Sequence, residues 1–254
     1  MSRILWTKDE LIIALSLYFK IPFSKLVEKN PKIIVMSRIL GRTPSALSMK
    51  LCNFARLDPE LQKRGIKGLP AGSKSDIVVW NEFYQNFDKL SIESTKLLSK
   101  KRGLSIEQEL EQNEIDFPLG KDKQQLIKVR INQYFFRQMI LSSYDNQCCI
   151  TGINIPTLLN ASHIVPWSKD EKNRLNPHNG LCLNVIHDKA FDNGLITITP
   201  DFTIKISKVL KKAAKNNTIQ NLFINYDDKP IIQPFINTPN KEFLEYHNKF
   251  VFQS

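Results

Sequence analysis

Histidine is concentrated in one short window of the chain, residues 161–194. The sequence has four histidines, and His163, His178 and His187 all lie in this window. Imidazole is both a base that works near neutral pH and a common metal ligand. A cluster of this kind predicts a site where an imidazole base acts beside a bound metal.

The window has the pattern of two short strands followed by a helix. ASHIV at 161–165 and GLCLN at 180–184 are strand-like, and a polar loop joins them. VIHDKAFD at 185–192 is expected to form a short helix. This arrangement brings His163 and His187 together across a small hairpin, where one divalent metal fits beside one base.

Asn179 stands between these two histidines, 16 residues after His163 and 8 before His187. With SHIVPWS, NPHNGLCL and HDKAFDNGL around the three residues, the window resembles the ββα-metal site of the HNH endonuclease family. The flanking stretches are similar to bacterial restriction-type HNH proteins: FFRQMILSSYDNQCCITG, GLITITPDFTIKIS, EFLEYHNKF and, at the N-terminus, LGRTPSALSMKLCNFARLDP. The resemblance therefore covers most of the chain.

The resemblance implies catalytic roles for all three residues. His163 is expected to be the general base for the attacking water, His187 a metal ligand, and Asn179 the residue that holds the loop and orients His163. One divalent cation is implied, Mg2+ or alternatively Mn2+. The products are expected to carry a 5′-phosphate and a 3′-hydroxyl.

Two positions depart from the best-known family pattern. Ser162 stands where many members have Asp or His as first metal ligand, and Phe191 stands where some members have a second helical histidine. Asp192 is the nearest carboxylate, and two roles stay open for it: metal ligand, or hydrogen-bonding group at the helix end. Asp188 is expected to face away from His187. The predicted metal ligands are therefore His187, Asp192 and Ser162.

The chain is basic, with 36 Lys and Arg residues against 25 Asp and Glu and a formal net charge of +11. Residues 1–90 hold 15 of the basic and 8 of the acidic residues, so this part carries more positive charge per residue than the rest. Such an excess favours a polyanionic partner. Double-stranded DNA is the partner expected here.

Three short helices are predicted at the N-terminus, over 7–19, from Pro31 to Gly41, and from Pro44 onwards. Thr7 and Glu10 have the spacing of a capping box. The layout is typical of a helix-turn-helix DNA-binding module, with a plain helical bundle as the alternative. DNA contacts are expected from polar residues at the start of the third helix: Arg42, Thr43, Ser45, Ser48 and Lys50.

Cations of the histidine window surround the predicted metal site. They are expected to neutralise backbone phosphates, which gives affinity without sequence information. For each lysine taken singly, a solvated surface role is the alternative. These cations are Lys169, Lys172, Arg174 and Lys189.

The predicted organisation is α+β: a basic helical module over 1–90, a linker or exposed helix over 91–127, and an HNH domain over 128–254. The last contains an amphipathic helix at 128–144, a hairpin around Pro200-Asp201 and a closing helix, on which His247 is expected to be structural. The cysteines are expected to be reduced, because no C-x2-4-C knuckle occurs. The sequence shows no secretion signal or membrane span, so a cytoplasmic protein is expected.

These features predict a metal-dependent DNA endonuclease of the restriction type. Two alternatives stay open: a non-specific or nicking HNH nuclease, and a DNA-binding regulator with a decayed HNH site, to which Ser162 gives weight. One site per chain cuts one strand, so double-strand cleavage predicts a homodimer or two successive cuts. A zinc-stabilised interaction module is disfavoured by the missing knuckle.

Overall fold

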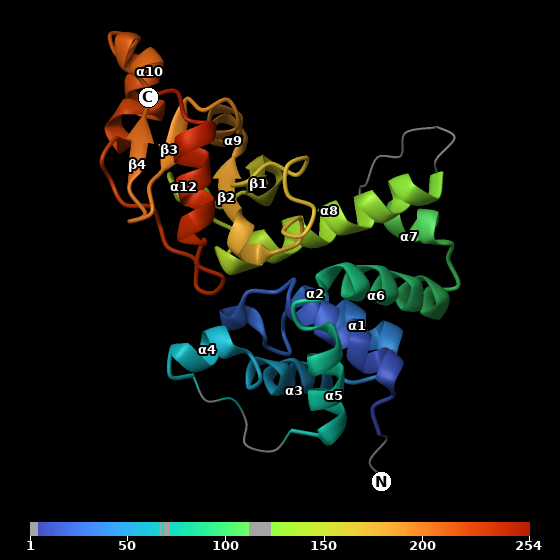
Figure 1. The fold of residues 1–254 in the computed structure, drawn as a ribbon. Coiled ribbons are helices and arrows are strands. Elements are labelled where there is room, and N and C mark those ends of the chain that lie inside the picture. Colours follow the sequence, from blue (N-terminus) through green and yellow to red (C-terminus); the bar gives the residue numbers. More distant parts are fainter. Residues whose placement is uncertain (1–4, 67, 69–71, 112–122) are drawn as a thin grey trace. The chain divides into compact units, whose positions relative to one another are not determined.

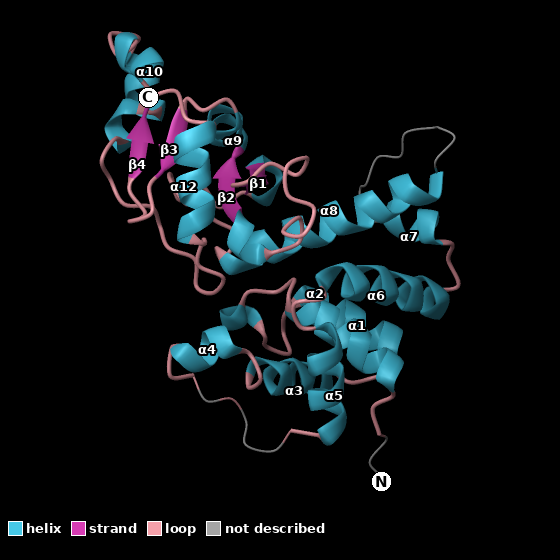
Figure 2. Cartoon of the chain, in the orientation of Figure 1, coloured by secondary structure: helices cyan, strands magenta, loops and turns pink. Residues whose placement is uncertain are grey.

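The computed structural model describes residues 5–66, 68, 72–111 and 123–254. It divides the chain into two compact units, Met1–Met139 and Ile140–Ser254 (Figure 1). The N-terminal unit is helical, and the C-terminal unit combines helices with two small antiparallel sheets (Figure 2). The architecture is therefore α+β, as predicted. None of the helices that the structure describes is both long enough and apolar enough to span a membrane.

Helices of the N-terminal unit begin and end at the signals present in the sequence. Thr7 and Glu10 form the capping box of α1, Asn30 caps α2, and Gly41 ends α2 in a left-handed conformation with φ of 65°. Thr43 caps α3. The three predicted helices are confirmed. The helices are α1 (Lys8–Tyr18), α2 (Pro31–Leu40), α3 (Pro44–Ala55), α4 (Pro59–Lys63), α5 (Lys74–Phe83), α6 (Phe87–Arg102), α7 (Ile106–Glu111) and α8 (Lys123–Ser143), with a 3-10 turn η1 at Phe23–Lys25.

Helix α1 is the centre of the N-terminal unit, since it contacts α3, α5 and α6. Its residues from Glu10 to Tyr18 are all buried, as expected for a helix that is apolar on nearly every side. Aromatic rings pack around its C-terminal end, with Phe19 edge-on to Phe87 and Trp80 stacked on Phe54. This packing supplies much of the apolar burial that stabilises the unit.

The region predicted as a linker or exposed helix, 91–127, starts within α6, which packs against α1. Small hydroxyl side chains make this possible: Ser94 Oγ lies 3.0 Å from Ser16 Oγ on α1, and Ser91 donates to the Asn132 side chain on α8. The segment is rich in serine and lysine and therefore reads as polar. Serine side chains are small, however, so the helix face that carries them can pack against α1. Residues 112–122 of the predicted linker lie outside the described residues. The division between units falls after residue 139, not at 90 or 127.

The C-terminal unit contains the predicted strand, loop, strand and helix, followed by the hairpin and the closing helix. CCITG, which precedes these elements, forms a turn, with Gly152 at φ of 73°. The elements are η2 (Pro156–Leu158), β1 (Leu159–His163), η3 (Pro177–Asn179), β2 (Gly180–Asn184), α9 (Val185–Asp192), β3 (Ile196–Ile198), β4 (Ile204–Ile206), α10 (Lys208–Lys212), α11 (Asn217–Leu222), η4 (Ile224–Tyr226) and α12 (Lys241–Phe250).

Strands β1 and β2 are antiparallel, with Leu159 opposite Asn184 and His163 opposite Gly180. Helix α9 packs against both strands, so β1, β2 and α9 form one ββα motif. The Asn184 side chain caps α9 by accepting from the backbone N–H groups of Ile186 and His187, at 3.0 and 2.9 Å. The cap fixes how the helix leaves the second strand.

Candidate functional site

His163 ends strand β1 and is half-buried beside the loop that follows. Its Nε2 lies 3.0 Å from the backbone oxygen of Arg174. A carbonyl oxygen only accepts, so Nε2 carries the proton and Nδ1 is the basic nitrogen. Burial lowers the pKa of His163, while the Arg174 carbonyl and the charge of Asp188 act in the opposite direction. The ring is thus held in one tautomer and favours the neutral form that a general base requires.

Asn179 clamps the loop between β1 and β2. The side chain is 1% exposed, and its Oδ1 accepts from the Val165 N–H at 2.8 Å. Its Nδ2 donates to the backbone oxygens of Val165 and Asn173, at 3.2 and 3.3 Å. These three bonds join both ends of the loop next to His163. The geometry is that of the positioning role predicted for Asn179.

Trp167 and Arg174 organise the same loop. The His163 ring stands edge-on to Trp167, with 5.4 Å between ring centroids. The Arg174 guanidinium lies 5.1 Å above the Trp167 ring, and its Nε donates to the Trp167 backbone oxygen at 2.8 Å. Arg174, predicted to contact DNA, therefore also holds the carbonyl that orients His163. The other predicted phosphate contacts, Lys169, Lys172 and Lys189, are exposed.

His187 is placed differently from the prediction. It is 1% exposed, and its Nε2 lies 2.7 Å from the backbone oxygen of Leu222. Its Nδ1 accepts from the Asn184 amide at 3.1 Å, and its ring is edge-on to Phe223. One nitrogen therefore carries a hydrogen and the other has its lone pair in use, whereas a metal needs a free lone pair on one of them. In this structure His187 is an interior packing residue with both ring nitrogens engaged, an arrangement that differs from the expected ligand role.

Cys148 is a buried thiol near His187. Burial alone raises the pKa of Cys148, but hydrogen bonds with neighbouring groups, Thr151 among them, outweigh it and lower that pKa to about 7. All four cysteines are free thiols, as predicted, although Cys52 is only partly buried. His187 thus contacts interior groups through both ring nitrogens and through its ring.

Asp188 and Asp192 lie on a different face of α9 from the buried His187. They are four residues apart, so their side chains share one side of the helix. Asp188 Oδ2 accepts from the Asn160 amide of β1 at 2.7 Å, and its charge is close enough to His163 to affect the pKa of that ring. Desolvation and the neighbouring Asp188 charge raise the pKa of Asp192. A pair of carboxylates that repel each other is an environment that a cation stabilises.

Ser162 lies on the face of β1 that Asn160 shares, because side chains alternate along a strand. Asn160 contacts Asp188, so this face is directed towards α9. The Ser162 residue is 3% exposed, and its hydroxyl has no hydrogen-bond partner among the described residues. A buried, unsatisfied oxygen is uncommon in folded proteins. Because Ser162 faces α9, its hydroxyl oxygen could join the Asp188 and Asp192 carboxylates as a donor to a cation.

The end of α9 bears on the hydrogen-bonding role left open for Asp192. Asn193, not Asp192, bonds the last turn, with its amide 2.7 Å from the backbone oxygen of Lys189. The helix-end role is therefore filled by another residue. Across the described ranges, no three His, Cys, Asp or Glu side chains converge as a ready metal cage. Sequence reasoning missed Asp188 because it measured ligand spacing from His187; the Asp188–Asp192 spacing was the signal that could have found it.

Two cations predicted to bind DNA in the N-terminal unit are used inside it. Arg42, with a side chain 10% exposed, pairs with Glu10 at 2.6 Å and lies over the Trp6 ring. Lys50, with a side chain 7% exposed, pairs with Asp76 at 2.6 Å. Both ion pairs stabilise contacts between helices, so the predicted phosphate contacts of these two residues are not available in this structure.

The remaining predicted residues of α3 are partly available. Thr43 Oγ1 accepts from the Ala46 N–H at 3.2 Å as the N-cap, and Ser48 donates to the Leu26 backbone oxygen at 2.7 Å. Ser45 is exposed. In the loop of the C-terminal unit, His178 Nδ1 lies 2.7 Å from the Thr238 backbone oxygen, so it is a loop anchor.

Two antiparallel strands, a capped helix and a clamped loop around an imidazole define a ββα nuclease-type site. The family model for HNH endonucleases matches residues 148–199, which include β1, β2, α9 and β3. The C-terminal unit therefore carries an HNH endonuclease domain, and this indicates a nuclease. No curated protein matches the chain.

Proposed function

We propose that the chain is a metal-dependent DNA endonuclease that hydrolyses phosphodiester bonds to 5′-phosphate and 3′-hydroxyl ends, and that its biological role is restriction of foreign DNA. The observation that carries the nuclease proposal is the His163 geometry. Its Nε2–H is held by the Arg174 carbonyl, which leaves Nδ1 as the base. The restriction role is supported by the resemblance of the flanking sequences to restriction-type HNH proteins. A homodimer would bring two such sites to the two strands.

His163 takes a proton from the attacking water at Nδ1 in this proposal. Asn179 keeps the loop closed on β1, and Trp167 limits the tilt of the imidazole. A base held in one tautomer and one orientation needs little rearrangement before it accepts the proton. The exposed Lys169 and Lys172 bind backbone phosphates on either side of the cut.

The donors on α9 and β1 fit a hard cation. Asp188 and Asp192 supply carboxylate oxygens, and Ser162 offers a buried hydroxyl. Mg2+, with Mn2+ as the alternative, is commonly bound by one or two carboxylates together with water and substrate phosphate. When bound, the cation supplies electrostatic stabilisation of the charge that builds on the scissile phosphate. His187 is left out of this donor set.

Cleavage of supercoiled plasmid and of modified and unmodified genomic DNA tests the function. Wild type, His163→Ala and a Lys29→Met control at an exposed residue outside the site are each assayed with EDTA, Mg2+ and Mn2+. We expect metal-dependent cutting that falls roughly 10²- to 10⁴-fold in His163→Ala and stays near wild type in Lys29→Met. Discrete fragments support restriction, and random fragments support a non-specific nuclease. Tight DNA binding without cutting on any substrate would favour the decayed-site regulator.

Binding of Mn2+, followed by electron paramagnetic resonance without DNA, tests the donor set independently of activity. Asp188→Asn and Asp192→Asn are expected to weaken Mn2+ binding by at least about tenfold, because each removes a charged oxygen donor. His187→Gln is expected to retain Mn2+ binding but to lower the free energy of unfolding by about 1–3 kcal/mol, through its lost interior hydrogen bonds. Loss of Mn2+ binding in a stable His187→Gln protein would restore His187 as a ligand.

A further inference from the structure

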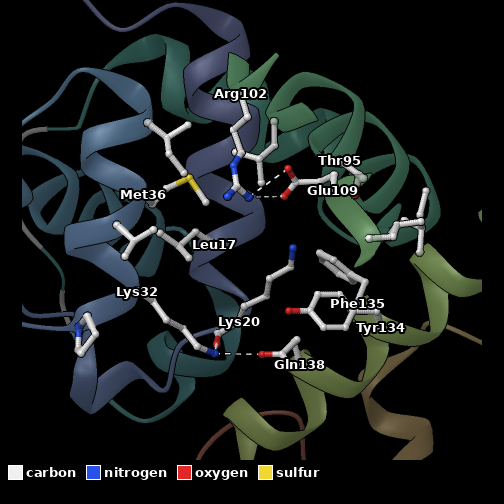
Figure 3. Close-up of a pocket in the computed structure, with 16 residues that line it drawn as sticks. Leu17, Lys20, Lys32, Met36, Thr95, Arg102, Glu109, Tyr134, Phe135 and Gln138 are labelled. Atoms are coloured by element: carbon white, nitrogen blue, oxygen red, sulfur yellow. Dashed lines mark hydrogen bonds and ion pairs between the residues drawn. The ribbon is translucent and has the colours of Figure 1, made fainter. Parts of the chain in front are cut away.

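A hollow of about 360 Å³ lies within the N-terminal unit. Its walls come from α1, α2, α6, α7 and α8 (Figure 3). The lining is mainly apolar and aromatic, including Leu17, Met36, Leu98, Leu110 and Phe135. Volumes of this size, mostly apolar with a few polar groups, are typical of small-molecule sites.

Lys20 places an ammonium inside this apolar hollow. Its Nζ lies 5.0 Å from the Phe135 ring centroid and 6.0 Å from that of Tyr134. Figure 3 shows the Lys20 side chain running through the hollow, with its ammonium between Glu109 and Phe135. No carboxylate of the described residues forms an ion pair with it. An aromatic face offsets only part of the cost of desolvating an ammonium.

The charged groups around Lys20 are already engaged or carry the same sign. The carboxylate of Glu109 accepts two hydrogen bonds from Arg102 Nη1, at 3.0 and 3.1 Å. Lys32 Nζ is bound to the Gln138 side chain at 3.0 Å and to the Lys20 backbone oxygen at 3.4 Å. Among the described residues, the lining therefore has three cations, Lys20, Lys32 and Arg102, against one carboxylate, Glu109. An anion would balance this excess; a second cation or a neutral molecule would not.

We propose that this hollow binds a small organic anion, a carboxylate or sulfonate with an apolar body, whose charged group pairs with Lys20. The apolar body lies against Leu98, Met36 and the Tyr134 and Phe135 rings. This site is separate from the nuclease proposal and does not depend on it. The mainly apolar lining distinguishes it from a phosphate-backbone surface, where cations are displayed to solvent.

Two naphthalene probes that differ in charge test the proposal on the full chain. 8-Anilinonaphthalene-1-sulfonate carries the anion, and N-phenyl-1-naphthylamine has the same body without it. Titration by fluorescence is done with wild type, Lys20→Met, Lys20→Arg and a matched Lys29→Met control, since Lys29 is exposed and outside the hollow. We expect one saturable sulfonate site that weakens by at least about tenfold in Lys20→Met only. Binding of the uncharged probe is expected to change little.

Proton linkage supplies a second readout. Burial and the charge of Lys32 lower the pKa of Lys20 to about 8, while Glu109 acts in the opposite direction. Sulfonate affinity is therefore expected to fall by about tenfold between pH 7 and pH 9 in wild type, and not in Lys20→Arg, which stays charged. The arginine variant separates Lys20 from the other titratable groups that face the hollow: Lys32, Arg102, Glu109 and Tyr134.

Several outcomes would overturn the proposal. These are absence of a saturable sulfonate site in folded wild type, equal weakening in Lys20→Met and Lys29→Met, or equal loss of both probes in Lys20→Met. Circular dichroism establishes folding for each variant. If Lys20→Met fails to fold, Lys20→Arg decides: retained affinity at pH 9 in Lys20→Arg supports the charge contact, and a fall in Lys20→Arg as large as that of wild type contradicts it.

Discussion

The two units bury titratable groups in opposite ways. The N-terminal unit buries ion pairs: Arg42 with Glu10, and Lys50 with an Asp76 that is 0% exposed. The C-terminal unit buries imidazoles instead, with His187 and His247 each 1% exposed. Ion pairs described in the C-terminal unit involve surface residues, such as Lys211 with Asp227. The difference predicts that the first unit is sensitive to loss of one partner, and the second to acid.

His247 shows how the C-terminal unit keeps an imidazole neutral. Its ring stacks on Phe191 with 3.7 Å between centroids, and Nε2 lies 3.1 Å from the Phe191 backbone oxygen. Nδ1 accepts from the Thr197 hydroxyl at 2.8 Å. Both nitrogens are satisfied by an uncharged ring, and a second proton would break the Thr197 bond. The structural role predicted for His247 agrees with these contacts.

The largest expected effect is on the paired charges. Lys50→Met removes the cation and leaves the Asp76 carboxylate buried, so we expect the free energy of unfolding to fall by about 3–5 kcal/mol. Lys29→Met, a matched loss of one exposed lysine, should change it by less than about 0.5 kcal/mol. Urea unfolding read by amide hydrogen exchange reports each unit separately.

The double variant Lys50→Met/Asp76→Leu tests whether the loss in Lys50→Met comes from the unpaired Asp76 carboxylate. Asp76 also accepts from the Ser73 N–H at 3.0 Å in the α5 capping box, so the double variant loses a cap worth about 1 kcal/mol. It should nevertheless be more stable than Lys50→Met, because the unpaired charge is gone. A double variant that is less stable than the single would contradict the buried-pair explanation.

The second effect concerns acid. Burial lowers the pKa of His247 to about 4, whereas the unfolded chain has an ordinary histidine pKa of about 6.5. The unfolded state then binds more protons as pH falls, so stability present at pH 7 is lost between about pH 6.5 and 4. The loss from pH 7 to pH 5 is about 2 kcal/mol.

Hydrogen exchange at pH 7 and pH 5, corrected for intrinsic rates, measures this loss by unit. The C-terminal unit should be destabilised by the acid, and His247→Gln should remove most of the pH dependence. The paired ions of the N-terminal unit should hold over the same range. Equal destabilisation of both units in wild type would break the comparison between paired charges and buried imidazoles.

Local signals in the sequence predicted most of the elements. Capping residues such as Thr7 and Thr43, and the left-handed Gly41, act within one turn of the helices that they bound. The two strands and helix of the ββα motif follow from alternation and a short apolar run. These features depend on neighbours in the chain, so periodicity and capping rules are sufficient to find them.

Side-chain partners from distant segments could not be predicted in this way. His187 faces the interior because Leu222, 35 residues later, supplies a carbonyl at 2.7 Å. Lys50 pairs with Asp76, and Ser94 with Ser16, across helices that the sequence does not place. Charge counts therefore overestimated the cations available for DNA in the N-terminal unit. Burial of partners decides availability, and burial is a tertiary property.

The smallest expected effect is on exposed cations of the nuclease loop. Lys169 and Lys172 are exposed, so Lys169→Met and Lys172→Met should each change the unfolding free energy by less than about 0.5 kcal/mol. If each contacts one phosphate, the slope of log affinity for duplex DNA against log salt should become shallower by about 0.9 per substitution. Fluorescence anisotropy across a salt series measures this slope, with Lys29→Met as the control. An unchanged slope in the Lys169→Met/Lys172→Met double variant would show that neither lysine contacts DNA phosphates. The contrast between exposed cations in this loop and paired charges in the helical unit would then no longer explain DNA binding.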